Sequence, residues 1–411
     1  SPLLTTFLAV RRLTWRWRKP VLIFLITLFG ATINLQTSDG YVLKQYLYWH
    51  YIGISFDQWL FELKEILLFS PEYGTKGDVF SHVMSYLVGH VLRMPEQYFL
   101  FVSFVYAYFF VSAMDKLLRW DRQRKFSMLF WVILINFIAY RFIDNMQTVR
   151  TWTGLWVLFY GAVGYYQERK KKYLAVMLMA PLFHVAYFLI ALPAYVVVFL
   201  RRIGTGPSFL IVLYSLSFFV NIDQTEVIQQ LETTELGAQK VKGYYYENEA
   251  ESSLLKTDES SNLYTRYGKF WSLPNAPHFL AWAIILGGLF SKRKMTELEI
   301  GLFSTGILMA ILANLIDFIP TFSIRTMANA GIYITATSML LVLRYETGLL
   351  FWPVRARALI CLSLLTFVPY IIYTLANMLQ FTSVFMIIMP IAGLFPDFNL
   401  SLREFIRVFF F

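Results

Sequence analysis

A stretch of 28 residues without a charged side chain, YLAVMLMAPLFHVAYFLIALPAYVVVFL, runs from Tyr173 to Leu200. A helix that crosses about 30 Å of hydrocarbon needs about 20 residues, so this stretch is too long for one straight helix and too short for two full ones. Pro181 and Pro193 interrupt it, and each removes a helical hydrogen bond. We therefore expect two short or broken helices here. Membranes tolerate such breaks only where the freed backbone is buried in protein or faces a water-filled cavity.

Other uncharged stretches surround this one, and most have the length of a single span. They cover residues 21–38, 97–114, 126–140, 151–167, 203–222, 270–291, 300–316, 326–343 and 358–396. The chain is 57% hydrophobic and only 15% charged, with a mean hydropathy of +0.54. Because soluble domains carry about 25% charged residues, this composition excludes a soluble globular protein. No internal repeat is visible, so we predict an all-α, polytopic integral membrane protein, one domain over residues 1–411 with about eleven or twelve transmembrane helices.

Basic residues are clustered between these stretches, at 11–19, 116–125, 169–172, 201–202, 292–294 and 344–357. The clusters fall on alternate loops, as cytoplasmic loops do under the positive-inside rule. The formal net charge of +10 therefore indicates membrane topology and not nucleic-acid binding. The opposite face then carries two long outer loops, about 37–95 and 223–277. The second holds nine acidic residues against five basic ones, the reverse of the cytoplasmic loops.

Two segments of the first outer loop have the spacing of amphipathic helices. Segment 57–67 places apolar side chains opposite three acids, and segment 80–91 repeats apolar side chains at the same spacing. We expect both to lie at the outer membrane interface. The apolar positions are Trp59, Leu60, Leu63, Ile66 and Leu67, then Phe80, Val83, Leu87 and Val91, and the acids are Asp57, Glu62 and Glu65.

Motifs of soluble enzymes are absent: the sequence has no GxGxxG, GxxxxGK[ST], HExxH or GxSxG pattern. The single cysteine, Cys361, excludes an intramolecular disulfide and a cysteine-based metal cluster. We therefore expect no cofactor and no metal. The chemistry must come from polar residues at the outer ends of helices, where a charge is costly unless it has a partner or a function.

The first such group is Asp144, Gln147 and Arg150, which lead into an apolar helix. Their i, i+3, i+6 spacing places them on one face of a helical segment. Guanidinium pairs bidentately with phosphate, which favours an anion clamp. The alternative is an arginine that extends to the interface and pairs with Asp144.

The second candidate is His184, inside the uncharged stretch and three residues after Pro181. A neutral histidine hydrogen-bonded between helices is one interpretation. The other is a histidine that lines a wet cavity beside the break and transfers protons near neutral pH.

Asp317 and Arg325 flank Pro320 at another outer helix end. They are either a structural ion pair or a second anion-binding group, since two guanidiniums around one pyrophosphate would neutralise most of its charge.

Asp39 and Tyr41 follow the first span, and Asp78 lies further along the same outer loop. Outer tyrosines are typical of the aromatic belt at the interface, but sugars also stack on such rings. An outer carboxylate has the chemistry of a general base toward a hydroxyl. Tyr245, within a run of three tyrosines in the acidic loop, has the same two interpretations.

The stretch from Asp144 to His184 resembles the EpsG-like branch of the Wzy-type polysaccharide polymerases. The shared pattern is a polar turn with Arg150, a helix, the basic run ERKKK at 168–172, a short apolar helix and then Phe183-His184. In the family the arginine is often followed by glutamine, whereas here Thr151 follows it.

The resemblance extends over about residues 20–345. Asp39 with Tyr41, and Asp78 leading into 80–87, are similar to acidic positions in that family's first outer loop. Arg325 resembles its later arginine.

The resemblance implies a polymerase in the bacterial inner membrane that joins oligosaccharide repeat units carried on undecaprenyl pyrophosphate at the outer face. It implies Arg150 and Arg325 at the pyrophosphate, His184 as a positioning or proton-transferring group, and Asp39 or Asp78 as the base. The bilayer and a chain-length regulator are the other expected partners.

Two other functions remain. A membrane-embedded glycosyltransferase for lipid-linked sugars would use Asp39 toward the acceptor or a metal. A transporter or flippase for lipid-linked oligosaccharides would use the broken helices as a pathway.

Overall fold

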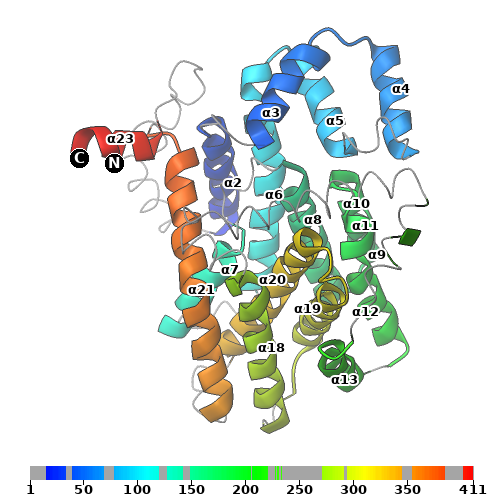
Figure 1. Ribbon diagram of the computed structural model, residues 1–411, viewed down its shortest axis with the longest axis vertical. Helices are drawn as coiled ribbons and strands as arrows, with labels where there is room; N and C mark the ends of the chain where they lie inside the picture. The colour runs from blue at the N-terminus through cyan, green and yellow to red at the C-terminus, as the bar shows by residue number, and fades with distance from the viewer. Residues whose placement is uncertain are drawn as a thin grey trace.

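The computed structural model contains only helices as regular elements in the part of the chain that it describes (Figure 1). That part consists of residues 15–33, 39–68, 78–119, 127–141, 149–204, 206–220, four residues between 227 and 233, 271–290, 294–344, 354–384 and 401–410. The prediction of an all-α protein is confirmed for these residues. Most of the acidic outer loop and residues 385–396 of the uncharged stretch 358–396 lie outside them.

Four helices in the described ranges are long and apolar enough to cross a membrane. They are α6 (Tyr98–Arg119) with the short turn before it, α19 (Glu297–Leu315), α20 (Pro320–Arg344) and α21 (Val354–Phe381). Each is formed by an uncharged stretch that the sequence marked as a span. Shorter apolar helices are α7 (Met128–Ala139) and α13 (Pro207–Ser217).

Helix α20 lies at the centre of the bundle, and every side chain from Thr326 to Leu343 is buried. A helix that is buried all round needs partners on all sides. Here α19, α18 (Leu273–Phe290) and α7 surround it. The contacts are close because glycine faces a bulky residue: an added Cβ on Gly306 would lie 2.7 Å from Ile334.

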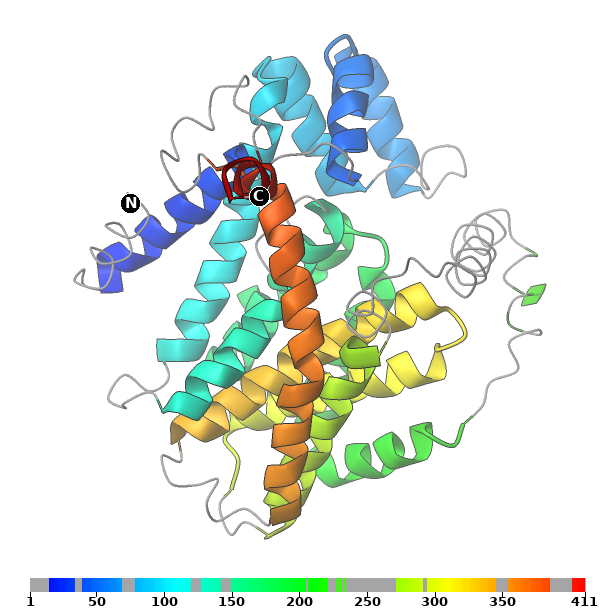
Figure 2. The ribbon, with the colours of Figure 1, turned by 60° about the vertical axis from the view of Figure 1, so that its left-hand side comes forward.

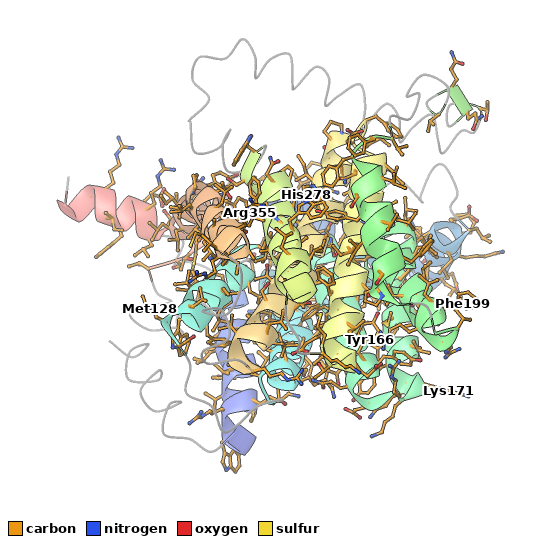
Figure 3. All side chains as sticks on the ribbon, turned by 90° about the horizontal axis from the view of Figure 1, so that it is seen from below. Met128, Tyr166, Lys171, Phe199, His278 and Arg355 are labelled. Carbon is orange, nitrogen blue, oxygen red and sulfur yellow. The ribbon has the colours of Figure 1, made fainter. Side chains whose placement is uncertain are left out.

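Helix α8 (Val149–Glu168) packs on the inner side of α6, and α2 (Trp15–Ala31) packs on the other side of α6. Seen from below, the side chain of Tyr166 lies inside the bundle, whereas Lys171, Phe199 and Met128 project outward (Figure 3). Tyr166 bonds to Thr305 on α19 at 2.7 Å. These contacts join α8 to the central pair α19 and α20.

The uncharged stretch 173–200 is broken, as predicted, but into four short helices and not two. They are α9 (Lys171–Leu178), α10 (Ala180–Phe183), α11 (Tyr187–Ile190) and α12 (Leu192–Arg202). Pro181 and Pro193 each lie in the first turn of a new helix, where the missing N–H costs nothing. The remaining break is at His184, whose backbone is extended.

Five helical segments form a layer above the bundle, at the top of Figures 1 and 2. They are α3 (Asp39–Tyr46), π-helical turns at Leu47–Tyr51 and Tyr86–Val91, α4 (Phe56–Leu67) and α5 (Val79–Ser85). Both predicted amphipathic segments are helical. Beside the end of α21, the short helix α23 (Leu402–Phe410) lies across its axis (Figure 1).

One detail of α4 corrects the sequence analysis. Glu62, expected on the polar face, is buried and bonded to His50 at 2.8 Å and to Gln58 at 3.2 Å. Periodicity cannot reveal this, because the partner histidine comes from a separate turn. Phe56, Leu60 and Leu67 are exposed on the same helix.

Candidate functional site

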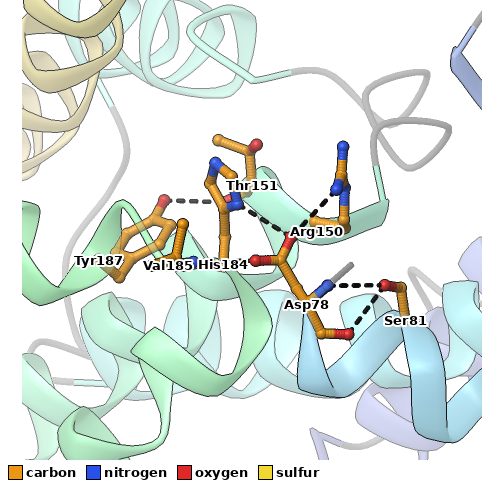
Figure 4. Close-up of polar contacts among 7 residues, drawn as sticks. All are labelled: Asp78, Ser81, Arg150, Thr151, His184, Val185 and Tyr187. Carbon is orange, nitrogen blue, oxygen red and sulfur yellow. Dashed lines mark hydrogen bonds and ion pairs between the residues drawn. The ribbon is translucent and has the colours of Figure 1, made fainter. Parts of the chain in front are cut away.

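The candidate site lies where the upper layer meets the broken segment, and its centre is Asp78 (Figure 4). Only 4% of this side chain is exposed. One carboxylate oxygen, Oδ1, accepts a hydrogen bond from the backbone N–H of Val185 at 3.0 Å. The other, Oδ2, lies 3.0 Å from Nδ1 of His184 and 3.3 Å from the guanidinium of Arg150. Residues more than 70 positions apart in the sequence therefore meet at one carboxylate.

The chain break after α10 produces this geometry. Because His184 is extended, the N–H of Val185 is not used inside a helix and is free to donate to Asp78. On the other side, Asp78 is the residue just before α5, and the hydroxyl of Ser81 bonds to its backbone. The rings of Phe80 and Phe183, 4.4 Å apart, hold α5 against α10.

Arg150 approaches from the beginning of α8, where it is the second residue. Its side chain is 42% exposed, although its partner Asp78 is almost fully buried. The arginine therefore links the buried carboxylate to the exposed side of the site. A guanidinium in this position can contact a ligand anion without moving Asp78.

The charges around Asp78 keep it ionised. Burial raises the pKa of its carboxyl group, but the hydrogen bond with His184, the positive charge of Arg150 and the hydrogen bond from the Val185 N–H together hold that pKa below its ordinary value. An ionised carboxylate only accepts hydrogen bonds, so Nδ1 of His184 is the donor in this pair. In the neutral ring, Nε2 then carries a lone pair.

His184 is itself buried, and in the described part of the chain its Nε2 has no hydrogen-bond partner. Buried polar atoms are nearly always paired, so an unpaired ring nitrogen needs an explanation. One explanation is that this nitrogen accepts a proton from the hydroxyl group of a bound molecule.

Tyr187 connects this centre to the middle of the bundle. Its hydroxyl donates to the carbonyl of Thr151 at 2.7 Å and lies 3.5 Å from the amide oxygen of Asn329 on α20. Gly154 on α8 allows the ring this close, because an added Cβ there would lie 2.9 Å from it. Asn329 in turn donates to the carbonyl of Arg325, one helical turn earlier.

The structure brings together three of the five residues expected to be catalytic: Asp78, Arg150 and His184. Arg325 lies half-buried near the start of α20, a turn from Asn329. Asp39 begins α3, and its side chain lies outside the described part of the chain.

Of the five residues expected to bind substrate, the structure describes two, Tyr41 and Asp317. Tyr41 on α3 is 42% exposed, and Asp317 is exposed in the turn after α19. No contact joins either of them to Asp78 in the described residues. Asp144, Gln147 and Tyr245 lie outside those residues.

Sequence reasoning missed Arg141, Tyr187 and Asn329. Arg141 directly follows the uncharged stretch 126–140, where an arginine normally extends to the interface, so its position gave no signal. Tyr187 and Asn329 sit inside apolar helices, where one more polar residue gives no signal in a single sequence.

No family model, no curated protein and no solved structure matches this chain. Among the described residues, no group of three or more His, Cys, Asp or Glu side chains is placed to hold a metal ion.

Proposed function

We propose that this chain is a multi-pass protein of the bacterial inner membrane that polymerises oligosaccharide repeat units linked to undecaprenyl pyrophosphate. We propose about eleven or twelve spans, and the four long apolar helices are among them. The layer formed by α3, α4 and α5 lies at the outer face. A chain-length regulator is a further partner.

The observation that carries this proposal is the contact of Asp78, His184 and Arg150. A buried carboxylate holds Nδ1 of a histidine, and an exposed guanidinium lies beside them. This set provides a base, a group that fixes the base's tautomer, and a cation for a phosphate leaving group. Because a sugar linked to a lipid pyrophosphate is already activated, glycosyl transfer from it needs no group beyond these three.

The reaction follows from the positions of the groups. The acceptor hydroxyl oxygen attacks the anomeric carbon of the donor sugar and forms the new glycosidic bond. The bond between that carbon and the phosphate oxygen breaks, and undecaprenyl pyrophosphate leaves with the electron pair. Nε2 of His184 takes the hydroxyl proton, while Arg150 stabilises the charge that develops on the leaving phosphate.

We assign Asp78 a different role from the base that the resemblance implies. Its lowered pKa makes it a weak base, and all of its strong contacts are used inside the protein. We therefore assign proton abstraction to His184 and positioning to Asp78. A positioned general base typically contributes about 10²- to 10⁴-fold to a rate.

The four short helices of segment 171–202 also fit a transporter, since broken helices line substrate pathways in many carriers. A transporter, however, does not require a histidine whose tautomer is fixed by a buried carboxylate.

The test is incubation of the purified protein in nanodiscs with a lipid-pyrophosphate-linked repeat unit and EDTA, with product length read on a gel. A ladder spaced by one repeat unit supports the polymerase. One added sugar that appears only when metal is restored would indicate the glycosyltransferase instead. Movement of the lipid across the bilayer without a new bond would indicate a transporter.

A further inference from the structure

Tyr187, the first residue of α11, is fully buried beside the Asp78 site and bonds to both segments that carry the other members of that site (Figure 4). Its backbone N–H donates to the carbonyl of His184 at 2.9 Å. Its hydroxyl donates to the carbonyl of Thr151, the residue after Arg150, at 2.7 Å. One residue therefore joins the turn that begins at His184 to the first turn of α8.

The ring of Tyr187 also packs directly on the backbone of α8. Gly154 allows this contact, because an added Cβ there would lie 2.9 Å from the ring and 3.3 Å from Phe183. Gly154 comes four residues after Arg150, so the two positions lie on the same face of the helix. The tyrosine is thus held against α8 at its ring and at its hydroxyl, on the face from which Arg150 extends.

Arg150 needs such a restraint, because its own side-chain contact is weak. The side chain is 42% exposed and lies 3.3 Å from Asp78, which is longer than a strong charge-assisted hydrogen bond. Partly exposed ion pairs contribute little, and a long side chain has many rotamers. Asp78 therefore does not fix the guanidinium by itself. The backbone that carries Arg150 has to be held from elsewhere, and Tyr187 holds it one residue away.

The hydroxyl of Tyr187 does not face a substrate. The side chain is fully buried, and the single hydroxyl proton is used by the carbonyl of Thr151. The other neighbour of this hydroxyl is the amide oxygen of Asn329 on α20, at 3.5 Å. Any effect of the hydroxyl on a reaction therefore has to pass through the residues that it holds.

We propose that Tyr187 is a positioning residue that fixes the guanidinium of Arg150 relative to Nε2 of His184. The inference rests on the proposed function, in which the arginine stabilises the leaving phosphate while the histidine takes the hydroxyl proton. Because the attacking and leaving oxygens meet at one anomeric carbon, the two groups have to act at a set separation. A misplacement of about 1 Å at a reacting group lowers a rate by about 10²-fold.

The first test is Tyr187→Phe, which keeps the ring and removes only the hydroxyl. The contact of Arg150 with the phosphate is strongest in the transition state, so kcat should fall about tenfold or more while KM for the lipid-linked repeat unit changes less than about twofold. Tyr333→Phe is the matched control. Tyr333 on α20 is equally buried, but its hydroxyl has no hydrogen-bond partner among the described residues, so kcat should not change. A kcat for Tyr187→Phe within about twofold of wild type would overturn the proposal.

A double-mutant cycle separates positioning from a general loosening of the fold. If the hydroxyl of Tyr187 acts through Arg150, Tyr187→Phe should slow the wild-type protein and have no further effect in Arg150→Gln. A loss of the same factor in both backgrounds would mean that the hydroxyl acts on the fold as a whole, and would overturn the proposal.

Amide hydrogen exchange gives a readout that needs no polymerisation. The amides of residues 153–156 make the first hydrogen bonds inside α8. They should exchange several times faster in Tyr187→Phe and at the wild-type rate in Tyr333→Phe, because only the first variant releases the turn. Equal exchange in Tyr187→Phe and wild type would refute the restraint. If the wild-type protein forms no product ladder, the proposed function fails, and the exchange rates still decide whether Tyr187 holds the turn of Arg150.

Discussion

Asp78→Asn tests the site most finely, because the two oxygens of Asp78 have different partners. Oδ1 faces the Val185 N–H, and Oδ2 faces His184 and Arg150. An asparagine must keep its oxygen toward the Val185 N–H, which places its NH₂ group toward Nδ1 of His184. That NH₂ donates to Nδ1, so the ring proton moves to Nε2. The base is then in the wrong tautomer.

The expected loss of rate is about 10²- to 10⁴-fold, the usual contribution of a positioned base. The cost in stability is much smaller. Arg150 is 42% exposed and regains hydration, and the neutral ring of His184 keeps a hydrogen bond to the new amide, so the loss is about 1–2 kcal/mol and not the 3–5 kcal/mol of a fully buried broken pair. The assay is initial rate of polymerisation together with thermal unfolding in the same nanodiscs.

Ser81→Ala is the matched control, since this hydroxyl bonds only to the backbone of Asp78 in the described structure. It should lower stability by about 1 kcal/mol and leave the tautomer and the rate nearly unchanged. If folded Asp78→Asn polymerises within about threefold of wild type, well short of a base's contribution, the reasoning from the carboxylate to the tautomer is refuted.

Three further predictions concern packing and pH. Gly331→Ala should cost about 1–3 kcal/mol in unfolding free energy, because its Cβ would lie 2.5 Å from the ring of Tyr140. Gly288→Ala, with open space around it, is the control and should cost nothing. Equal melting temperatures for the two variants would contradict this prediction. The stability that Asp78 contributes should be complete above its unfolded pKa of about 3.9 and disappear as pH falls through its lower folded pKa. The measurement is the difference in unfolding free energy between wild type and Asp78→Asn from pH 6 downward. A difference that stays constant with pH would count against the prediction. Burial lowers the pKa of His82, so the fold should lose stability as pH falls below about 6.5, where the unfolded chain binds the extra proton, and His82→Asn should flatten that slope.

The sequence predicted the helical class and the position of the break because both depend on local composition. Uncharged stretches coincide with helices such as α6, α19 and α20, and the prolines lie where new helices begin. The number of short helices in segment 171–202 was not predictable, because neither proline nor glycine marks the extended residue His184, where the segment breaks again.

The site was predictable in its residue types and less so in its roles. His184 stood out because an ionisable residue inside an apolar stretch is costly, and Arg150 stood out because its spacing places it on one face with Asp144 and Gln147. That Asp78 meets both is a tertiary fact, and it is the reason why we propose a positioning role for Asp78 in place of the base. Arg141 was overlooked because one arginine beside a span normally extends to the interface, and only its burial under Trp152 separates it from that case.

The central claim is that His184, held by Asp78, removes a proton from a sugar hydroxyl while a pyrophosphate lipid leaves. The most direct measurement is the release of undecaprenyl pyrophosphate per glycosidic bond formed, in nanodiscs that contain wild-type protein or His184→Gln. We expect one lipid released for each bond formed in the wild type. In the variant we expect a rate at least about 10²-fold lower, with the same ratio of lipid released to bonds formed. Bond formation by His184→Gln at the wild-type rate, or lipid release without bond formation, would contradict the account.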